Sequence, residues 1–316
     1  MNTYDVVVFG SINLDIVTHV KEYPSYGDSV LAQKIETIPG GKGANQAITV
    51  AKQGSQMLFI SSVGKDSSGN QMIQNLESYG IQTDKILRSE KSSTRMYVIF
   101  VDENGENTMA GSLGANLTIP LDYIEETFSN IDAKVLLLQM ETSPQAIIKT
   151  MQLAKEKGMF VILDPAPAGA YFPEVLKYAD VITPNQQETE MITGIHVDSQ
   201  ESAIKAAKKI QELGVQNSII KMGDKGNLVY QSGQITYVPA LKVRALNTVG
   251  AGDTFAGALA SEYVKTGDLV KAVEYANIAA GIKVSHNGGQ EVIPTESQVR
   301  KYMEEMSKEL IQQFIE

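Results

Sequence analysis

Two glycine-rich segments have the residue types that bind phosphate. The first reads PGGKGANQA over residues 39–47, and a helical pattern follows it. Glycine lets the backbone approach a ligand closely, and a helix N-terminus offers free N–H groups to an anion. Asn45 both donates and accepts hydrogen bonds, which suits a hydroxylated ligand, although a glycine turn needed only for packing is the alternative. The segment is not a Walker A loop, because no Ser or Thr follows Lys42 at the required place.

The second segment reads NTVGAGDTFAGAL over residues 247–259. It puts Gly250, Ala251 and Gly252 ahead of a helix whose first turn carries Asp253. The N–H groups of this turn could hold a phosphate or a developing negative charge. Asp253 beside such an anion hole could accept the proton of a hydroxyl nucleophile. The alternative is that this aspartate only caps the helix.

Polar side chains also follow several apolar runs. In TPNQQE, Asn185 and Glu188 would lie at the carboxyl edge of a sheet, where α/β folds bind ligands. An amide and a carboxylate there suit a hydrated Mg²⁺ beside phosphates, whereas the alternative is an ordinary helix start. Asn13, Asp15 and Glu141 come directly after apolar runs as well, and could reach the same edge or simply form turns.

The elements that must position these side chains are short apolar runs bounded by turn residues. Their near-continuous hydrophobicity is typical of strands buried on both faces of a parallel sheet. Helical patterns alternate with them, as over residues 203–213, where Asp198 and Glu201 form the expected cap, and from Thr295 toward the C-terminus. This alternation predicts an α/β doubly wound fold, a mainly parallel sheet flanked by helices. The expected strands cover residues 5–9, 57–61, 135–140, 159–163, 181–183 and 218–222.

Two regions, residues 15–38 and 88–113, break this alternation. Both are partly polar and contain turns, and residues 94–101 show the mixed pattern of a half-exposed antiparallel sheet. Because they follow the first strand and a later helix, they could meet as one small sheet at an edge. We therefore predict one domain over residues 1–316 with a small β-sheet lid.

Composition narrows the classes of function. The 316 residues are 43% hydrophobic and 20% charged, which is typical of a globular protein. Asp plus Glu number 37 and Lys plus Arg 27, so the net charge of −10 argues against nucleic acid or an anionic membrane as partner. The lack of Cys excludes disulfides, and 3 His without ligand spacing argue against zinc. Neither a basic leader nor an apolar stretch of ~20 residues is evident, which predicts a cytoplasmic protein.

The segments occur together and in order, and the chain resembles the ribokinase family of carbohydrate kinases, also called PfkB-type kinases, over essentially its whole length. The resemblance implies a ribokinase-like fold and phosphorylation of a sugar hydroxyl by ATP with Mg²⁺. It is carried by GSINLD at 10–15, GGKGANQA at 40–47, QME at 139–141, DPAPA at 164–168, TPNQQE at 183–188, KMGDKG at 221–226, NTVGAGDTFAGAL at 247–259 and GGQ at 288–290.

The resemblance also implies roles for individual residues. Asp253 matches the catalytic base, and Gly250, Ala251 and Gly252 match the anion hole for the transferred phosphoryl group. Glu188 matches a carboxylate linked to Mg²⁺, which we expect to act through water. Sugar-binding positions are matched by Asn13, Asp15, Gly41, Lys42, Gly43, Asn45 and Glu141. Nucleotide-binding positions are matched by Asn185, Lys221, Gly223, Gly226 and Asn277.

Two positions near the phosphates depart from the family pattern. Ribokinases usually have Asp, a ligand of an activating monovalent cation, where this chain has Asn247. Because Asn supplies an oxygen but no charge, a K⁺ site there would be weakened or altered. Lys221 stands where ribokinases often have Thr, and would add a charge facing the phosphates. The alternative is a lysine exposed at a strand end.

Two lid positions bear on the size of the substrate. Arg95 stands where ribokinases often have a small residue, and Gly111 where they commonly place a bulky apolar residue against the ribose. A missing side chain would enlarge the pocket, and an arginine could bind a phosphate with two hydrogen bonds. Together they indicate a substrate larger than ribose, and the alternative is that Arg95 points outward.

The leading hypothesis is a kinase that converts D-ribose and ATP to D-ribose 5-phosphate. The first alternative is a kinase of the same fold for deoxyribose, a ketohexose, a sugar phosphate or a nucleoside. The second is a non-catalytic regulator that binds sugar or nucleotide, against which the intact Asp253 argues. The resemblance also implies a homodimer formed through the lid, as in many family members.

Overall fold

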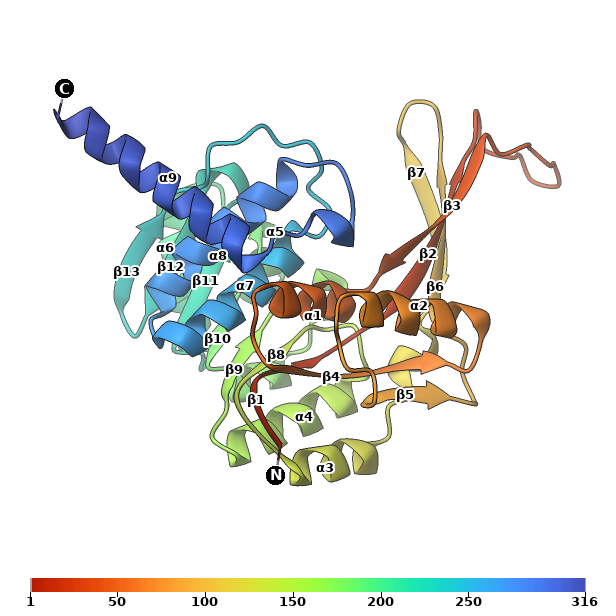
Figure 1. Ribbon diagram of the computed structural model, residues 1–316, viewed down its shortest axis with the longest axis horizontal. Helices are drawn as coiled ribbons and strands as arrows, with labels where there is room; N and C mark the ends of the chain where they lie inside the picture. Colours follow the sequence, from red (N-terminus) through yellow and green to blue (C-terminus); the bar gives the residue numbers. More distant parts are fainter. Residues whose placement is uncertain (1, 316) are drawn as a thin grey trace.

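The computed structural model describes the backbone of residues 2–315 and the side chains as far as Met306. Its nine-stranded sheet has the order β13-β12-β11-β10-β9-β8-β1-β4-β5 (Figure 1). Every pair from β5 to β11 is parallel. The strands are β1 (Asn2–Phe9), β4 (Met57–Gly64), β5 (Ile86–Ser89), β8 (Ile131–Leu138), β9 (Phe160–Leu163), β10 (Val181–Ile182), β11 (Asn217–Lys221), β12 (Asn227–Gln231) and β13 (Gln234–Val238).

Helices cover both faces of this sheet, and β1 shows why its residues are apolar without alternation. Val6 and Val8 belong to the core beneath α1, α2, α7, α8 and α9, whereas Val7 and Phe9 belong to the core beneath α3, α4, α5 and α6. Figure 1 shows α3 and α4 on the opposite side of the sheet from α1 and α2. The helices are α1 (Lys42–Lys52), α2 (Ser67–Ser78), α3 (Leu121–Ser129), α4 (Pro144–Glu156), α5 (Gln186–Thr193), α6 (Gln200–Glu212), α7 (Ala251–Thr266), α8 (Leu269–Val284) and α9 (Glu296–Ile315).

The expected doubly wound fold is confirmed, and all six expected strands are present at or within a few residues of their expected places. The antiparallel hairpin of β12 and β13 was not predicted from the sequence. Its two-residue turn is Ser232-Gly233, and both residues have positive φ, at 46° and 99°. Such a turn matches the twist of a hairpin, and a Ser-Gly pair is a weaker signal than Asn-Gly. Within residues 2–315, every helix falls short of the length and apolar character that crossing a membrane requires.

The expected cap of α6 is wrong by one residue. The side chain of Ser199, not Asp198, accepts the hydrogen bond from the backbone N–H of Ser202, and the Ser202 hydroxyl accepts from the Ser199 N–H. The helix therefore starts at Gln200, and the third helical residue is a serine rather than Glu201. A short hydroxyl side chain completes this box as well as a carboxylate does.

A second sheet of four strands stands beside the large one, and we call it the lid sheet. Its strands are β2 (Asn13–His19), β3 (Lys34–Gly40), β6 (Arg95–Val101) and β7 (Asn107–Ser112), in the order β3-β2-β6-β7. It projects from the body of the molecule to the right of Figure 1. The expected lid boundary at residue 88 is too early, because Arg88 and Ser89 pair with β4 in the large sheet. The chain enters the lid sheet at Asn13, directly after β1.

Candidate active site

The two glycine-rich segments meet at the end of β1. Helix α1 begins just after Gly41, and α7 begins just after Gly250. Two further glycines allow this approach, because a Cβ on Gly43 would lie 2.4 Å from the backbone nitrogen of Ser11 and a Cβ on Gly257 would lie 2.8 Å from the carbonyl of Gln46. The structure therefore places the N-termini of two helices side by side. At the start of α1, the N–H groups of Lys42, Gly43 and Ala44 already donate to Glu141 and Ser11.

Asp253 lies between these two helix N-termini and is 4% exposed. Its Oδ2 accepts a hydrogen bond from Asn45 Nδ2 at 2.9 Å, and its Oδ1 accepts one from Gln46 Nε2 at 3.3 Å. Burial raises the pKa of the Asp253 carboxyl, and the ammonium of Lys42 opposes that shift. The capping alternative is wrong, since Gly250 is the N-cap and no side chain caps α7. Two amides thus aim a buried carboxylate at the space between the turns.

A cavity of about 280 Å³ lies directly against Asp253. Asp15 contributes a carboxyl to its wall, and burial raises the pKa of that carboxyl to about 6 although Arg95 lowers it. Of the residues predicted to bind sugar, Gly43, Arg95 and Gly111 do not line the cavity. Those that do are Asn13, Asp15, Gly41, Lys42, Asn45 and Glu141, joined by Gly250, Lys283 and Gln290.

Arg95 does not point outward, so that alternative is wrong. The residue is 4% exposed, and its Nη2 lies 3.1 Å from Glu141 Oε1 and donates to the hydroxyl of Tyr97 at 2.8 Å. Glu141 is also held from its other side, because its Oε2 accepts hydrogen bonds from the Ser11 hydroxyl and the Lys42 backbone N–H. Arg95 therefore fixes the orientation of a cavity carboxylate from behind.

Gly111 does not enlarge the cavity, which corrects the second lid expectation. It lies opposite Tyr97 in the pairing of β6 and β7, and a Cβ at this glycine would lie 2.3 Å from the tyrosine ring. The ring thus fills the space that a bulky residue at position 111 would take. The sequence pattern could not show this, because Tyr97 and Gly111 are brought together only by strand pairing.

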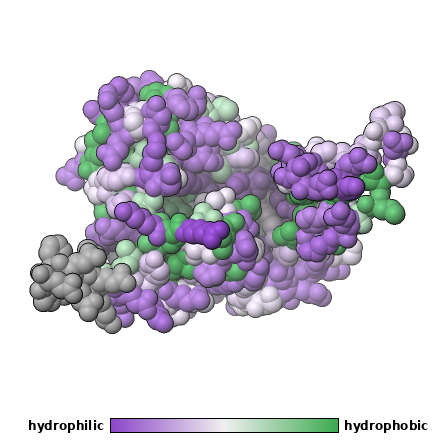
Figure 2. Space-filling model, turned by 90° about the horizontal axis from the view of Figure 1, so that it is seen from above, coloured by the Kyte–Doolittle hydropathy of each residue, from purple (hydrophilic) through white to green (hydrophobic). Residues whose placement is uncertain are grey.

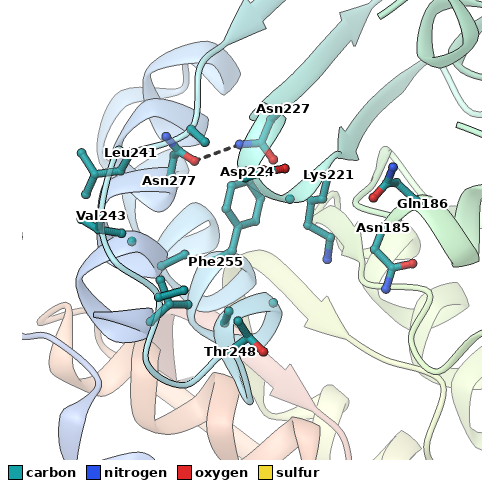
Figure 3. A pocket seen from close by; sticks show the side chains of 18 of the residues that line it. Asn185, Gln186, Lys221, Asp224, Asn227, Leu241, Val243, Thr248, Phe255 and Asn277 are labelled. Carbon is teal, nitrogen blue, oxygen red and sulfur yellow. Dashed lines mark hydrogen bonds between the residues drawn. The ribbon is translucent and has the colours of Figure 1, made fainter. Parts of the chain in front are cut away.

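We call the turn of Gly250, Ala251 and Gly252 the anion-hole turn, after the role expected for it. A larger cavity, of about 660 Å³, lies on the other side of this turn (Figure 3). Four positions predicted to bind nucleotide line it, namely Asn185, Lys221, Gly223 and Asn277. Ala251 and Gly252 and the apolar side chains of Leu241, Val243 and Phe255 complete the lining. Asn277 accepts a hydrogen bond from Asn227 Nδ2, drawn as a dashed line in Figure 3. Gly226 does not line the cavity. Its φ is 92°, and a Cβ would lie 2.3 Å from the Val238 carbonyl, so its role is to pack the hairpin.

Lys221 turns into this site rather than into solvent, so the exposed alternative is wrong. Its Nζ lies 3.1 Å from Asp164 Oδ1, and Asp164 is 1% exposed. The other oxygen of Asp164 accepts a hydrogen bond from Gln46 Nε2 at 2.9 Å. Asp164, the first residue of the DPAPA motif, and Gln46 are site residues that the sequence patterns did not assign a role. The position of Asp164 directly after β9 was the available signal, because the other polar site residues follow strands in the same way.

Asn185 and Glu188 form a capping box at the start of α5. The Asn185 side chain accepts from the Glu188 N–H, and the Glu188 carboxylate accepts from the Asn185 N–H and side-chain amide, at 2.8 to 2.9 Å. Burial raises the pKa of Glu188, and Lys221 opposes that shift. Among the described residues, no group of three His, Asp or Glu side chains could hold a metal ion by itself. Any Mg²⁺ near Glu188 would therefore need ligands from water and phosphate oxygens.

Taken together, a doubly wound fold, a buried carboxylate between two glycine-rich turns at helix N-termini, and adjoining small and large cavities define a small-molecule kinase. The sequence model of the pfkB family of carbohydrate kinases matches residues 3–296. The chain belongs to this family and is an ATP-dependent sugar kinase. The family and kinase class expected from the sequence are thereby confirmed.

Several relatives match 95% of this chain. A ribokinase from Haemophilus influenzae is 34% identical over 95% of this chain and 98% of its own length, and a deoxyribokinase from Salmonella typhi is 33% identical with the same coverage. Among solved structures, a ribokinase from Thermotoga maritima superposes with a TM-score of 0.84 at 36% identity, covering 95% of this chain and 99% of the other. An Arabidopsis thaliana ribokinase complexed with ribose and ATP gives 0.88 at 28% identity, covering 95% and 98%.

Proposed function

We propose that the sugar is D-ribose and that the product is D-ribose 5-phosphate. The observation that carries this proposal is the small cavity of about 280 Å³ against Asp253, whose walls offer Asn13, Asp15, Asn45 and Glu141 to hydroxyl groups. This volume is at the small end for ligand pockets, which suits a pentose. Gly111 no longer indicates a larger acceptor, because the ring of Tyr97 fills the space beside this glycine.

In the proposed reaction, Asp253 accepts the proton of the sugar hydroxyl as that oxygen attacks the γ-phosphorus of ATP. The bond between the γ-phosphorus and the oxygen that bridges it to the β-phosphate breaks, and ADP leaves. The backbone N–H group of Gly252, at the N-terminus of α7, stabilises the charge on the transferred phosphoryl group. The N–H group of Ala251, which donates to the Thr248 carbonyl at 3.2 Å, can share its hydrogen with the same group. Lys221 adds positive charge from the side of the nucleotide cavity. Bound Mg²⁺, reached by Glu188 through water, would neutralise phosphate charge.

The large cavity is proposed to hold ATP. Leu241, Val243 and Phe255 offer apolar contacts to the base. Asn185 and Lys221 lie across the cavity from Leu241 and Val243 (Figure 3), and Lys221 Nζ is 3.6 Å from the point that a Cβ of Gly252 would occupy, which favours this side for the phosphates. The two cavities share this turn, because Gly250 lines one and Ala251 lines the other. This arrangement puts the γ-phosphate next to the sugar. A cytoplasmic location remains a prediction, which a requirement for ATP favours.

The test is release of ADP from ATP and Mg²⁺ with ribose, deoxyribose, fructose, fructose 6-phosphate, tagatose 6-phosphate, adenosine and uridine as acceptors. Ribose is expected to have the highest kcat/KM, and the sugar phosphates the lowest, by about 100-fold or more. The reason is that the cavity is small and that its three carboxylates, of Asp15, Glu141 and Asp253, outnumber its two ammonium groups, of Lys42 and Lys283. Deoxyribose is the second candidate, favoured by the deoxyribokinase relative. A higher kcat/KM for a sugar phosphate than for ribose would contradict the proposal.

The affinity for ribose is expected to fall in acid because of Asp15. Burial raises the pKa of this carboxyl to about 6, so it takes up a proton at higher pH than an ordinary aspartic acid. The protonated form loses acceptor capacity for sugar hydroxyls, and the Kd for ribose should therefore rise as the pH falls through roughly 6. Calorimetric titration without ATP measures this directly. Asp15→Asn should bind ribose more weakly and show a flatter pH dependence, whereas an equally steep dependence would assign it to another group.

A homodimer through the lid sheet remains a proposal, and exposed apolar side chains of that sheet and of the segment between β2 and β3 support it. Leu31 is 94% exposed, Ile35 66% and Met109 55%. Figure 2 shows hydrophobic surface at the outer end of the lid sheet, on the right. Sedimentation velocity is expected to show a dimer that Ile35→Asp or Met109→Asp converts to monomer. The matched control is Ile235→Asp on β13, in the large sheet, which should leave the dimer intact. A monomeric wild-type chain would refute this assembly.

A further inference from the structure

Lys283 is a buried lysine that none of the roles above explains. It lies in the last turn of α8 and is 1% exposed, whereas the side chain of Lys271 on the same helix is 68% exposed. Taking an ammonium group out of water costs free energy unless hydrogen-bond and charge partners compensate for the lost hydration. Burial lowers the pKa of Lys283, and the carboxylates of Glu291 and Asp253 oppose that shift. A lysine at a helix C-terminus normally reaches solvent, so the inward direction needs a reason.

The ammonium lies behind the anion-hole turn. Lys283 Nζ donates to the Gly288 carbonyl at 3.1 Å, and its Cε lies 3.8 Å from the point that a Cβ of Gly250 would occupy. Lys283 also lines the sugar cavity together with Gly250 and Asp253. Its charge is thus next to both the N-cap of α7 and the carboxylate proposed as the base.

Asn247 ties the same turn to the same carbonyl. Its Nδ2 donates to the Gly288 carbonyl at 3.2 Å, and its Oδ1 accepts from the Val249 N–H at 2.9 Å. The backbone N–H groups of Leu246 and Asn247 both donate to the Val284 carbonyl, one residue beyond Lys283. The turn from Asn247 to Gly250 is therefore held against the end of α8 by one junction, and Lys283 supplies positive charge within it.

A resident K⁺ does not fit this junction. The resemblance places a monovalent-cation ligand at position 247, but Asn247 carries no charge and its oxygen already accepts a hydrogen bond from Val249. The facing carbonyl, that of Gly288, receives the Lys283 ammonium. A metal cation would have to compete with this ammonium for the same oxygen and would be repelled by its charge. The K⁺ site predicted to be weakened or altered by Asn247 is thus also affected by Lys283, whose ammonium on α8 occupies the Gly288 carbonyl.

We infer that Lys283 is a positioning residue whose ammonium takes the place of an activating monovalent cation. It holds the turn from Asn247 to Gly250 in position against the end of α8. It also keeps a positive charge behind the N–H groups that receive the phosphoryl group. The inference rests on the proposed phosphoryl transfer at this turn. Its consequence is that the wild-type enzyme needs no monovalent cation.

The first experiment uses the wild-type chain. Turnover is measured with Mg²⁺ and ATP in tetramethylammonium salt, and again with K⁺, Na⁺ or NH₄⁺ at the same ionic strength. The rates are expected to agree within about threefold, and a larger stimulation by K⁺ would overturn the inference. The melting temperature, read without any substrate, should likewise show no stabilisation specific to K⁺. This second readout decides the inference even if no sugar in the panel is turned over.

The second experiment removes the ammonium. In tetramethylammonium salt, Lys283→Met is expected to lower kcat by about tenfold or more while KM for the sugar changes less than about threefold. K⁺ or NH₄⁺ should restore part of the lost kcat and raise the melting temperature of this variant only. Lys283→Arg, which keeps the charge, should lose less, and Lys271→Met is the matched control on α8. An unchanged kcat in Lys283→Met, or a loss that no small cation restores, would show a merely structural lysine. If Lys283→Met fails to fold, the wild-type series alone decides.

Discussion

Replacing Asp253 by Asn is expected to lower kcat by about 1,000-fold or more, which is the upper part of the range for losing a positioned general base. The hydroxyl of a sugar is a very weak acid, so its oxygen attacks phosphorus well only while a base takes the proton. Asn has nearly the same shape but cannot accept that proton as a carboxylate does. The new amide can still accept one of the two hydrogen bonds, from Asn45 or from Gln46, because it has one oxygen and its NH2 group only donates.

The affinity for the sugar separates loss of the base from loss of the cavity. Calorimetry is expected to give a Kd for ribose within a few-fold of wild type, because Asp253 is one of several polar groups on the wall. Asp268→Asn is a matched control, since Asp268 caps α8 and Asn caps a helix equally well. A kcat for Asp253→Asn within tenfold of wild type would exclude this aspartate as the base.

Replacing Lys42 by Met is expected to lower kcat at neutral pH by about 100-fold, the scale of a buried charge left without its partner. The Lys42 ammonium faces four carboxylates, those of Asp253, Asp164, Glu141 and Glu188, and Asp253 contributes most to the raised pKa of the lysine. Without this cation, the pKa of Asp253 should rise further, because burial already raises it and Lys42 opposes that shift. A larger fraction of the base would then be protonated at neutral pH.

The sign of this effect can be read from a pH profile. Because the base must be deprotonated, the acid limb of kcat/KM should move to higher pH in Lys42→Met, and part of the lost activity should return in alkaline solution. Lys42→Arg keeps the charge and should leave the acid limb near its wild-type place. If the acid limb keeps its wild-type pH in Lys42→Met and kcat is lowered equally at every pH, Lys42 contacts the substrates and does not set the pKa of Asp253.

The strands that are buried on both faces could be predicted from local apolar runs in the sequence. Strand β1 was evident because Val6 to Phe9 are all apolar, and only a strand covered on both faces needs this. The hairpin of β12 and β13 was missed, since its turn is Ser232-Gly233 and its strands have no long apolar run. The N-cap of α6 was predicted one residue too early, because several residues near position 199 have side chains that cap helices well.

The amino-acid sequence by itself determined the layered sheet, the lid sheet, the two glycine turns and the positions of the polar residues that end the strands, because these depend on neighbours along the chain. Only the tertiary structure decided how they act together. Asn45 and Asp253, 208 residues apart, share a hydrogen bond. Tyr97 covers Gly111, and Lys283 turns inward to Gly288. The physical reason is that direction, burial and charge balance depend on side chains brought together from distant segments, and no local spacing records them.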